Sequence, residues 1–289
     1  FGKSVFVQCL RNLPSAPDPS LRTLVVRAVS EPWTRPNELT RHCIALIKAD
    51  PEIGPCISRA AAAFPATLSA DDLYGPSGLA ALSRDPLVRA FLENSRVSTL
   101  EMEQFLVAVR TILLDAALAA TDIAQAMDPA SDTLAFYCAV ARQCFIAEYV
   151  FLLSDADQAR ADSLRDSVLA ALQSNTPVPP VQLAALAAFI PLHRLDRDQN
   201  LLAHTWPAPV EALLTQQIHE PAEERRLRAT IPALTPIEDN VSVAVRDQYE
   251  EHPYPRWVEA PTLEQPATVD KHIRGLFPLA DYRHMNTVG

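Results

Sequence analysis

Apolar residues recur at intervals of three and four positions over most of the chain. That spacing places them on one face of an α-helix, and no stretch alternates apolar and polar residues convincingly enough to predict a strand. Proline-bearing stretches separate the periodic segments, and 65–78 forms a looser region among them. The pattern predicts helices over 3–13, 21–29, 38–47, 53–64, 86–92, 98–120, 131–153, 154–172, 181–192, 209–218, 235–251 and 269–276.

Local cap signals mark several of these helix starts. A side chain that accepts a hydrogen bond from the first helical turn typically precedes a helix, and proline is favoured at the first helical position. Ser98 with Glu101 three residues later has the form of a capping box. The other predicted starts are Asp85 before Pro86, Ser154 before Asp155, Ser69 before Asp71-Asp72, and Thr235 before Pro236.

Glycine is scarce, with 6 residues in 289, where an average usage of about 7% would give roughly 20. Hairpin turns and phosphate-binding loops both depend on glycine. The predicted fold is therefore all-α, either an irregular helical bundle or a short α-solenoid of tetratricopeptide-like helix pairs. No clean repeat of roughly 34 residues is present to decide between them.

The predicted organisation has three parts. Residues 1–83 form helical pairs, 84–234 form the main helical domain, and 235–289 form a helix followed by an extended strip rich in tyrosine, proline and tryptophan.

Charge and cysteine usage restrict the partners. A net charge of −10 argues against nucleic acid and anionic membranes. No apolar run reaches the roughly 18 to 20 residues of a membrane span. The five cysteines are odd in number and lie in apolar-periodic stretches, which predicts reduced core thiols, no metal site and a cytoplasmic protein.

The densest group of chemically distinctive residues is the strip 248–257, Gln-Tyr-Glu-Glu-His-Pro-Tyr-Pro-Arg-Trp. Pro253 and Pro255 exclude a helix there. Large amphipathic side chains on a stiffened segment suit the covering of a ligand or a neighbouring domain. A rigid linker whose aromatic residues pack on the helical body is the equal alternative.

Other polar groups carry weaker signals. Gln143 and Glu148 lie in the aromatic-rich stretch 136–151 and need partners if they are buried. We expect them to bond loop backbone rather than to face a cavity. The charged residues of 193–198 are interpreted as a solvated helix end, and 223–226 as an exposed face of mixed charge. No nucleophile elbow, P-loop or dinucleotide-binding glycine motif occurs, so no catalytic residue is assigned.

Three segments together resemble a known family. The segment 241–257, VSVAVRDQYEEHPYPRW, is similar to the signature that precedes the methyltransferase domain of bacterial tetratricopeptide-containing class I SAM-dependent methyltransferases. The segments 143–150, QCFIAEYV, and 100–110, LEMEQFLVAVR, resemble two less specific helical signatures of the same proteins.

The resemblance implies upstream repeats, a helical region, and a downstream Rossmann-like domain that binds S-adenosylmethionine through a glycine-rich turn. That turn is missing from these 289 residues, so we expect the helical part of a longer methyltransferase, with cofactor binding by the parent protein. The strip would then cover the cofactor site, with Tyr249, Tyr254 and Trp257 against adenine or the sulfonium and Glu250 or Arg256 at its amino-acid end. Gln143, Glu148 and Tyr149 belong to the substrate-side or structural helix.

Two alternatives remain open. The chain is otherwise a helical scaffold that binds a protein segment, or a domain that acts through self-association into a homo-oligomer. The implied partners are the downstream domain and a protein substrate or partner, and the methyl acceptor is not specified by the sequence.

Overall fold

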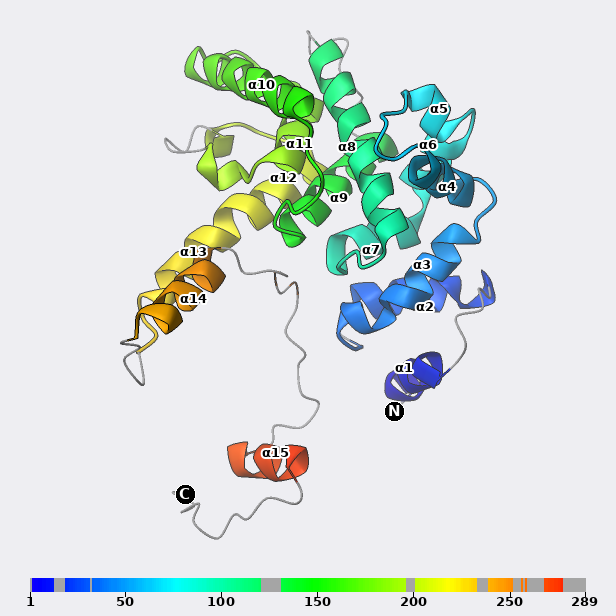
Figure 1. The fold of residues 1–289 in the computed structure, drawn as a ribbon, viewed down its shortest axis with the longest axis vertical. Helices are drawn as coiled ribbons and strands as arrows, with labels where there is room; N and C mark the ends of the chain where they lie inside the picture. Colours follow the sequence, from blue (N-terminus) through cyan, green and yellow to red (C-terminus); the bar gives the residue numbers. More distant parts are fainter. Residues whose placement is uncertain are drawn as a thin grey trace. The chain divides into compact units, whose positions relative to one another are not determined.

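The computed structural model describes residues 2–12, 19–31, 33–120, 131–195, 201–232, 239–251, 256, 258 and 268–277. All regular structure in these residues is helical and none is a strand, which confirms the all-α prediction (Figure 1). The tetratricopeptide-like pairing of helices is not confirmed.

The chain divides into two compact units, Phe1–Glu259 and Ala260–Gly289. The first holds α1 (Gly2–Asn12), α2 (Arg22–Ser30), α3 (Thr40–Lys48), α4 (Ile53–Ala63), α5 (Ala70–Tyr74), α6 (Gly78–Arg84), α7 (Pro86–Asn94), α8 (Leu100–Ala119), α9 (Asp132–Ile146), α10 (Asp155–Gln173), α11 (Pro180–Phe189), α12 (Ala208–Leu214), α13 (Glu220–Arg228) and α14 (Asn240–Glu251). It also holds the 3₁₀ turns η1 (Pro19–Leu21), η2 (Pro36–Leu39), η4 (Leu192–Arg194) and η5 (Leu201–Ala203), and the π-helical turn η6 (Thr215–His219). The second unit holds α15 (Val269–Leu276).

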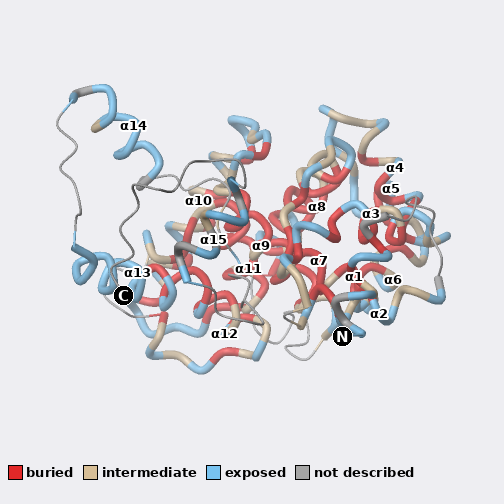
Figure 2. The backbone as a smooth tube through the Cα atoms, turned by 90° about the horizontal axis from the view of Figure 1, so that it is seen from below, coloured by how far each residue is buried: buried red, intermediate tan, exposed pale blue. Residues whose placement is uncertain are grey.

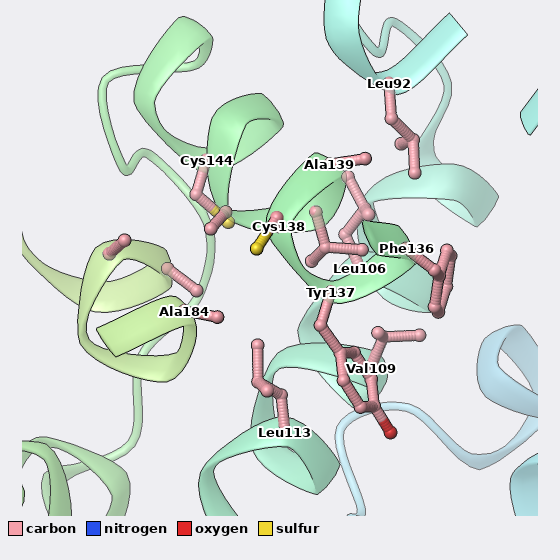
Figure 3. Packing of buried hydrophobic residues seen from close by; sticks show 14 of the residues in the cluster. Leu92, Leu106, Val109, Leu113, Phe136, Tyr137, Cys138, Ala139, Cys144 and Ala184 are labelled. Carbon is pink, nitrogen blue, oxygen red and sulfur yellow. The ribbon is translucent and has the colours of Figure 1, made fainter. Parts of the chain in front are cut away.

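Helices α8, α9 and α11 form the centre of the core of the first unit. Leu106 and Val109 of α8, Cys138 of α9 and Ala184 of α11 project into the same packed region (Figure 3). Helix α11 is buried almost all round, as its apolar sequence predicts, and its alanines allow close approach of α9. Burial falls off toward α13 and α14, which are largely exposed (Figure 2).

Elements from the predicted parts 1–83 and 84–234 pack together within the first unit. Helix α2 packs on α7 and α4 packs on α8, so elements on both sides of residue 83 share one core. Gly78 permits one of the close approaches within it, because a Cβ atom at this position would lie 2.4 Å from Sγ of Cys56.

Three of the predicted caps are confirmed. Asp85 Oδ1 accepts from the backbone N–H of Leu87 at 2.8 Å, Ser154 Oγ accepts from Asp157, and Ser69 Oγ accepts from Asp72. The predicted capping box at Ser98 is wrong, because the cap position of α8 falls on Thr99, whose side chain makes no capping bond within the described residues. The start predicted at Pro236 lies outside the described residues.

Other expectations need correction. The looser region 65–78 contains the short helix α5 and reaches the start of α6. The helix predicted over 131–153 ends at Ile146, well short of Leu153. Cys9 is exposed, whereas the other four cysteines are buried thiols as predicted. Among the described helices, none has the length and apolar character that crossing a membrane demands.

Candidate functional site

Helix α9 ends in a hydrogen-bonded cap that normally contains glycine. The Tyr149 N–H donates to the Cys144 carbonyl at 3.0 Å, and the Glu148 N–H donates to the Phe145 carbonyl at 3.0 Å. These two bonds define a Schellman motif, in which the residue at the Glu148 position, called C′, adopts a left-handed conformation and is usually glycine. Here it is glutamate, which explains why the sequence predicted no helix end at this point.

The backbone at this cap is strained. Glu148 has φ 49° and Tyr149 has φ 57°, both in the left-handed region. An L-residue with a Cβ atom pays roughly 1–2 kcal/mol to adopt this conformation. Such strain persists only where the surrounding contacts impose it, and it gathers at functional sites. The side chains of both residues are therefore of interest.

Tyr149 is held by polar contacts from two other elements. Its hydroxyl donates to the Ala187 carbonyl of α11 at 3.1 Å and lies 3.4 Å from Oε1 of Gln217. Burial raises the pKa of the Tyr149 hydroxyl well above its usual value, with Cys144 and Glu148 adding to the rise. Tyr149 thus stays protonated and acts as a donor.

Gln217, in the π-helical turn η6, organises this region from the inside. It is fully buried, and its Oε1 accepts from the Leu192 N–H at 3.1 Å. Its Nε2 donates to the Ala187 carbonyl at 3.2 Å. A π-helical turn is rare and often accompanies a functional site, and this one brings Gln217 between α9, α11 and the 3₁₀ turn η4.

His193 of η4 lies against the same group. Its Nδ1 is 3.1 Å from the Gln217 carbonyl oxygen, and its ring meets Phe145 edge to face at 6.4 Å. Burial lowers the pKa of His193, and the positive charges of Arg225, Arg194 and Arg256 lower it further. The imidazole is therefore neutral at pH 7, with its Nδ1–H donated to the carbonyl.

Arg256 docks on the end of α9 from the far end of the sequence. Its Nε forms an ion pair with Oε1 of Glu148, and its guanidinium carbon lies 4.2 Å from the centroid of the Phe145 ring. The Arg256 N–H also donates to the Ile146 carbonyl at 3.3 Å. The Arg256 and Glu148 side chains are only 17% and 11% exposed, so this ion pair is partly shielded from solvent.

Further charges surround this pair. Nη1 of Arg256 lies 3.6 Å from Oε2 of Glu224 on α13. Partial burial raises the pKa of Glu220, while Arg142 and Arg256 oppose that rise. The predicted exposed face 223–226 thus contributes one carboxylate to the site, although Glu223 and Arg226 pair with each other in solvent.

Arg110 of α8 holds the other end of the loop that follows α9. Its Nη2 donates to the Leu152 carbonyl at 2.7 Å, and its guanidinium carbon lies 4.5 Å from the centroid of the Phe189 ring. Burial lowers the pKa of Arg110, opposed by the nearby Cys144, Asp157 and Tyr149. Arg256 and Arg110, from two segments that are distant in the sequence, therefore hold the two ends of the chain segment between α9 and α10.

The site residues predicted from the sequence lie in different parts of the structure. Arg256, Glu148 and Tyr149 come together at this cap. Gln143 is buried elsewhere on α9, and with its amide oriented to satisfy both ends, its nitrogen donates to the Ser95 carbonyl at 2.6 Å and the Leu92 carbonyl at 3.0 Å. Gln143 thus bonds the backbone at the end of α7.

The remaining cofactor-binding candidates are not part of the described cap. Tyr249 lies on α14 with 66% of its surface exposed. Tyr254, Trp257 and the side chain of Glu250 lie outside the described residues.

Sequence reasoning did not identify Phe145, Gln217 and Arg110 as members of the site. It also placed His193 at a solvated helix end, which is wrong, because the ring is half-buried and bonded to Gln217. Gln217 offered one usable signal: a polar residue in the apolar segment 209–218 requires a buried partner.

The segments 100–110, 143–150 and 241–257 each contribute a residue to the cap of α9 or to the loop that follows it. Arg110 ends the first segment, Glu148 and Tyr149 lie in the second, and Arg256 lies in the third. Comparison with family models, curated proteins and solved structures finds no match to this chain. Within the described residues no group of histidine, cysteine and carboxylate side chains is arranged to hold a metal ion. The chemistry that the geometry supports is the binding of a guanidinium.

Proposed function

We propose that this chain is the non-catalytic helical region of a SAM-dependent methyltransferase, which recognises a substrate or partner and positions the strip 248–257 over the cofactor site of a downstream domain. The observation that carries the proposal is the docking of Arg256 on Glu148 and Phe145. It joins the most specific of the three methyltransferase-like segments to a second one.

A strip that covers a cofactor needs a fixed point. Methyl transfer from a sulfonium is an in-line displacement, so its rate depends on positioning and on the exclusion of water. Arg256 lies between Tyr254 and Trp257 in the sequence and is held by an ion pair, a ring contact and a backbone hydrogen bond. Anchoring at Arg256 restricts where the flanking aromatic side chains can reach.

The roles of the strip residues then separate. Arg256 is engaged by Glu148, so we assign it the anchoring of the strip rather than the binding of the cofactor carboxylate. Tyr254 and Trp257 are assigned the contacts with adenine or the sulfonium, because a cation is attracted to an aromatic face. S-adenosylmethionine is the cofactor of the parent protein, and this proposal expects a cytoplasmic enzyme with no nucleic-acid partner.

The test is calorimetric titration of the full-length parent protein with S-adenosylmethionine. We expect the parent to bind and this segment alone not to bind. Tyr254→Ala and Trp257→Ala in the parent should each weaken binding and turnover, whereas Ile231→Ala, at an exposed position of the helical region, should change neither. Unchanged affinity and turnover in both aromatic variants would contradict the proposal that the strip covers the cofactor site. A parent protein that does not bind S-adenosylmethionine would contradict the methyltransferase assignment.

A second function, that of a helical interaction scaffold, is favoured by helix α14. Val241, Val245 and Tyr249 are exposed at four-residue spacing, so they form one apolar stripe on the helix. A helix of this length is marginal in water without tertiary packing, and an amphipathic helix gains stability by docking into a partner groove. Val245→Asp should then abolish binding to that partner, while a mass that rises with concentration in light scattering would identify the partner as a second copy.

A further inference from the structure

We infer that Phe145, Glu148 and Glu224 form a guanidinium-binding site at the end of α9, and that the chain's own Arg256 occupies it as a releasable latch for the C-terminal end of α14. This inference concerns the helical chain itself and does not depend on a methyltransferase function.

The aromatic wall of the site is fixed in place before a guanidinium binds. Phe145 is buried, and its ring meets Tyr149 edge to face at 6.4 Å and His193 edge to face at 6.4 Å. Tyr149 is in turn held by the Ala187 carbonyl, and His193 by the Gln217 carbonyl. A binding surface whose supporting residues are themselves hydrogen-bonded loses little entropy when it is occupied.

The two carboxylates come from different elements and converge on one cation. Glu148 pairs with Nε of Arg256, and Glu224 lies 3.6 Å from Nη1. A planar guanidinium stacks on an aromatic ring and presents several fixed donors at its edge, which an ammonium group cannot do. The arrangement therefore selects arginine over lysine.

The left-handed backbone of Glu148 is the second indication that its carboxylate has a role. Glycine would fit this cap position without strain, yet the chain carries a glutamate with φ 49°. The glutamate supplies what glycine lacks, a carboxylate directed to Arg256.

Burial of the helix that precedes the latch does not oppose its release. Every described side chain of α14 is exposed or half-buried. Glu224 is 67% exposed, so solutes reach the carboxylate that lies 3.6 Å from Nη1 of Arg256. An arginine from another molecule has access to the same carboxylate, and its binding would displace Arg256.

Trypsin cleavage measures the release of Arg256. Trypsin cleaves after arginine, so Arg256 must leave the cap of α9 to enter the acidic specificity pocket of the protease. In the intact chain we expect slow cleavage after Arg256. Glu148→Gln keeps the size of the side chain but removes its charge, and should accelerate that cleavage about tenfold, with cleavage after Arg228 unchanged as the internal reference. Equal cleavage rates after Arg256 in both proteins would overturn the latch.

Occupancy of the site is tested separately in Arg256→Ala. This variant should bind ethylguanidinium, detected by chemical-shift changes of the Ile146 to Tyr149 amides, and should bind ethylammonium at least about tenfold more weakly. Adding Glu148→Gln to Arg256→Ala should abolish the ethylguanidinium response. No response in Arg256→Ala, or equal responses to both cations, would overturn the guanidinium site.

Discussion

Glu148 and Asn175 occupy the same position of the same helix-ending motif. Asn175 at the end of α10 has φ 54°, its N–H donates to the Leu172 carbonyl, and the following Thr176 N–H donates to the Ala171 carbonyl at 2.8 Å. Glu148 repeats this pattern at the end of α9. Asparagine adopts the left-handed conformation readily and glutamate does not, so the two helices end alike at different conformational cost.

Glycine substitution at the two positions separates backbone strain from the ion pair. Asn175→Gly should change the free energy of unfolding by only a few tenths of a kcal/mol, whereas Glu148→Gly in an Arg256→Ala background should raise it by about 1 kcal/mol through relief of strain. In the presence of Arg256 that gain should shrink, because the ion pair is lost. Urea unfolding of the wild type, the three single variants and the double variant measures these differences. Equal effects of Glu148→Gly with and without Arg256 would show that the ion pair contributes nothing.

Tyr149→Phe removes one buried hydroxyl and leaves the ring in place. Loss of the hydrogen bond to the Ala187 carbonyl should lower the free energy of unfolding by about 1 kcal/mol or somewhat less. The cost is reduced because Gln217 still donates a hydrogen bond to that carbonyl oxygen. The matched control is Tyr249→Phe on α14, where the exposed hydroxyl should be removable without measurable cost. Thermal unfolding compares them, and equal midpoints for the two variants would contradict the assigned role of Tyr149.

Neighbouring glutamines offer a second matched pair. Gln217→Leu leaves the Leu192 N–H without its acceptor and should lower the unfolding free energy by about 2–3 kcal/mol. Gln216 is also buried, but its Oε1 has no hydrogen-bond partner within the described residues, so Gln216→Leu should be far less costly. Denaturant unfolding decides the matter, and the reverse order of costs would refute this account of the π-helical turn.

His193 predicts a dependence of stability on pH. Its pKa is lowered in the folded state by burial and by Arg225, Arg194 and Arg256, so the unfolded chain binds the proton more readily. Stability from this group is complete above the unfolded-state pKa of about 6.5 and is lost as the pH falls below it toward the folded-state value.

His193→Asn keeps a donor near the Nδ1 position and does not titrate. The wild-type protein should therefore lose more unfolding free energy than this variant between pH 7.5 and pH 5.5, by up to about 1.4 kcal/mol per pH unit. His219→Asn, at an exposed position, is the control and should follow the wild type. A wild-type slope retained in His193→Asn would assign the effect to other groups.

Local chemistry made much of this fold predictable from sequence. The caps at Asp85 and Ser154 are formed with residues two or three positions away in the sequence. The continuous apolar sequence of α11 is itself sufficient to predict that this helix is buried. The end of α9 escaped prediction because Glu148 occupies a position where glycine is the usual signal.

The candidate site was less accessible to sequence reasoning because its contacts are distant in the chain. Arg256 meets Glu148 across more than one hundred residues, and Gln217 bonds Ala187 thirty residues away. His193 was misassigned because its charged neighbours in sequence suggested solvent, whereas the ring itself lies against Phe145. A pattern of charges reports exposure of a segment on average and not the direction of one side chain.

The π-helical turn Thr215–His219 lies within a continuous helical stretch that runs from α12 to α13. Each residue of an α-helix advances the side-chain direction by about 100°, and the wider turn absorbs one additional residue. Removing one residue from this turn would restore regular α-helix and leave the direction of Glu224 nearly unchanged, because one turn would still be completed. Removing one residue from the regular helix between this turn and Glu224 would instead rotate Glu224 by about 100°. The contact between Glu224 and Arg256 is therefore expected to tolerate the loss of a residue in the π-helical turn but not in the α-helical residues that follow it.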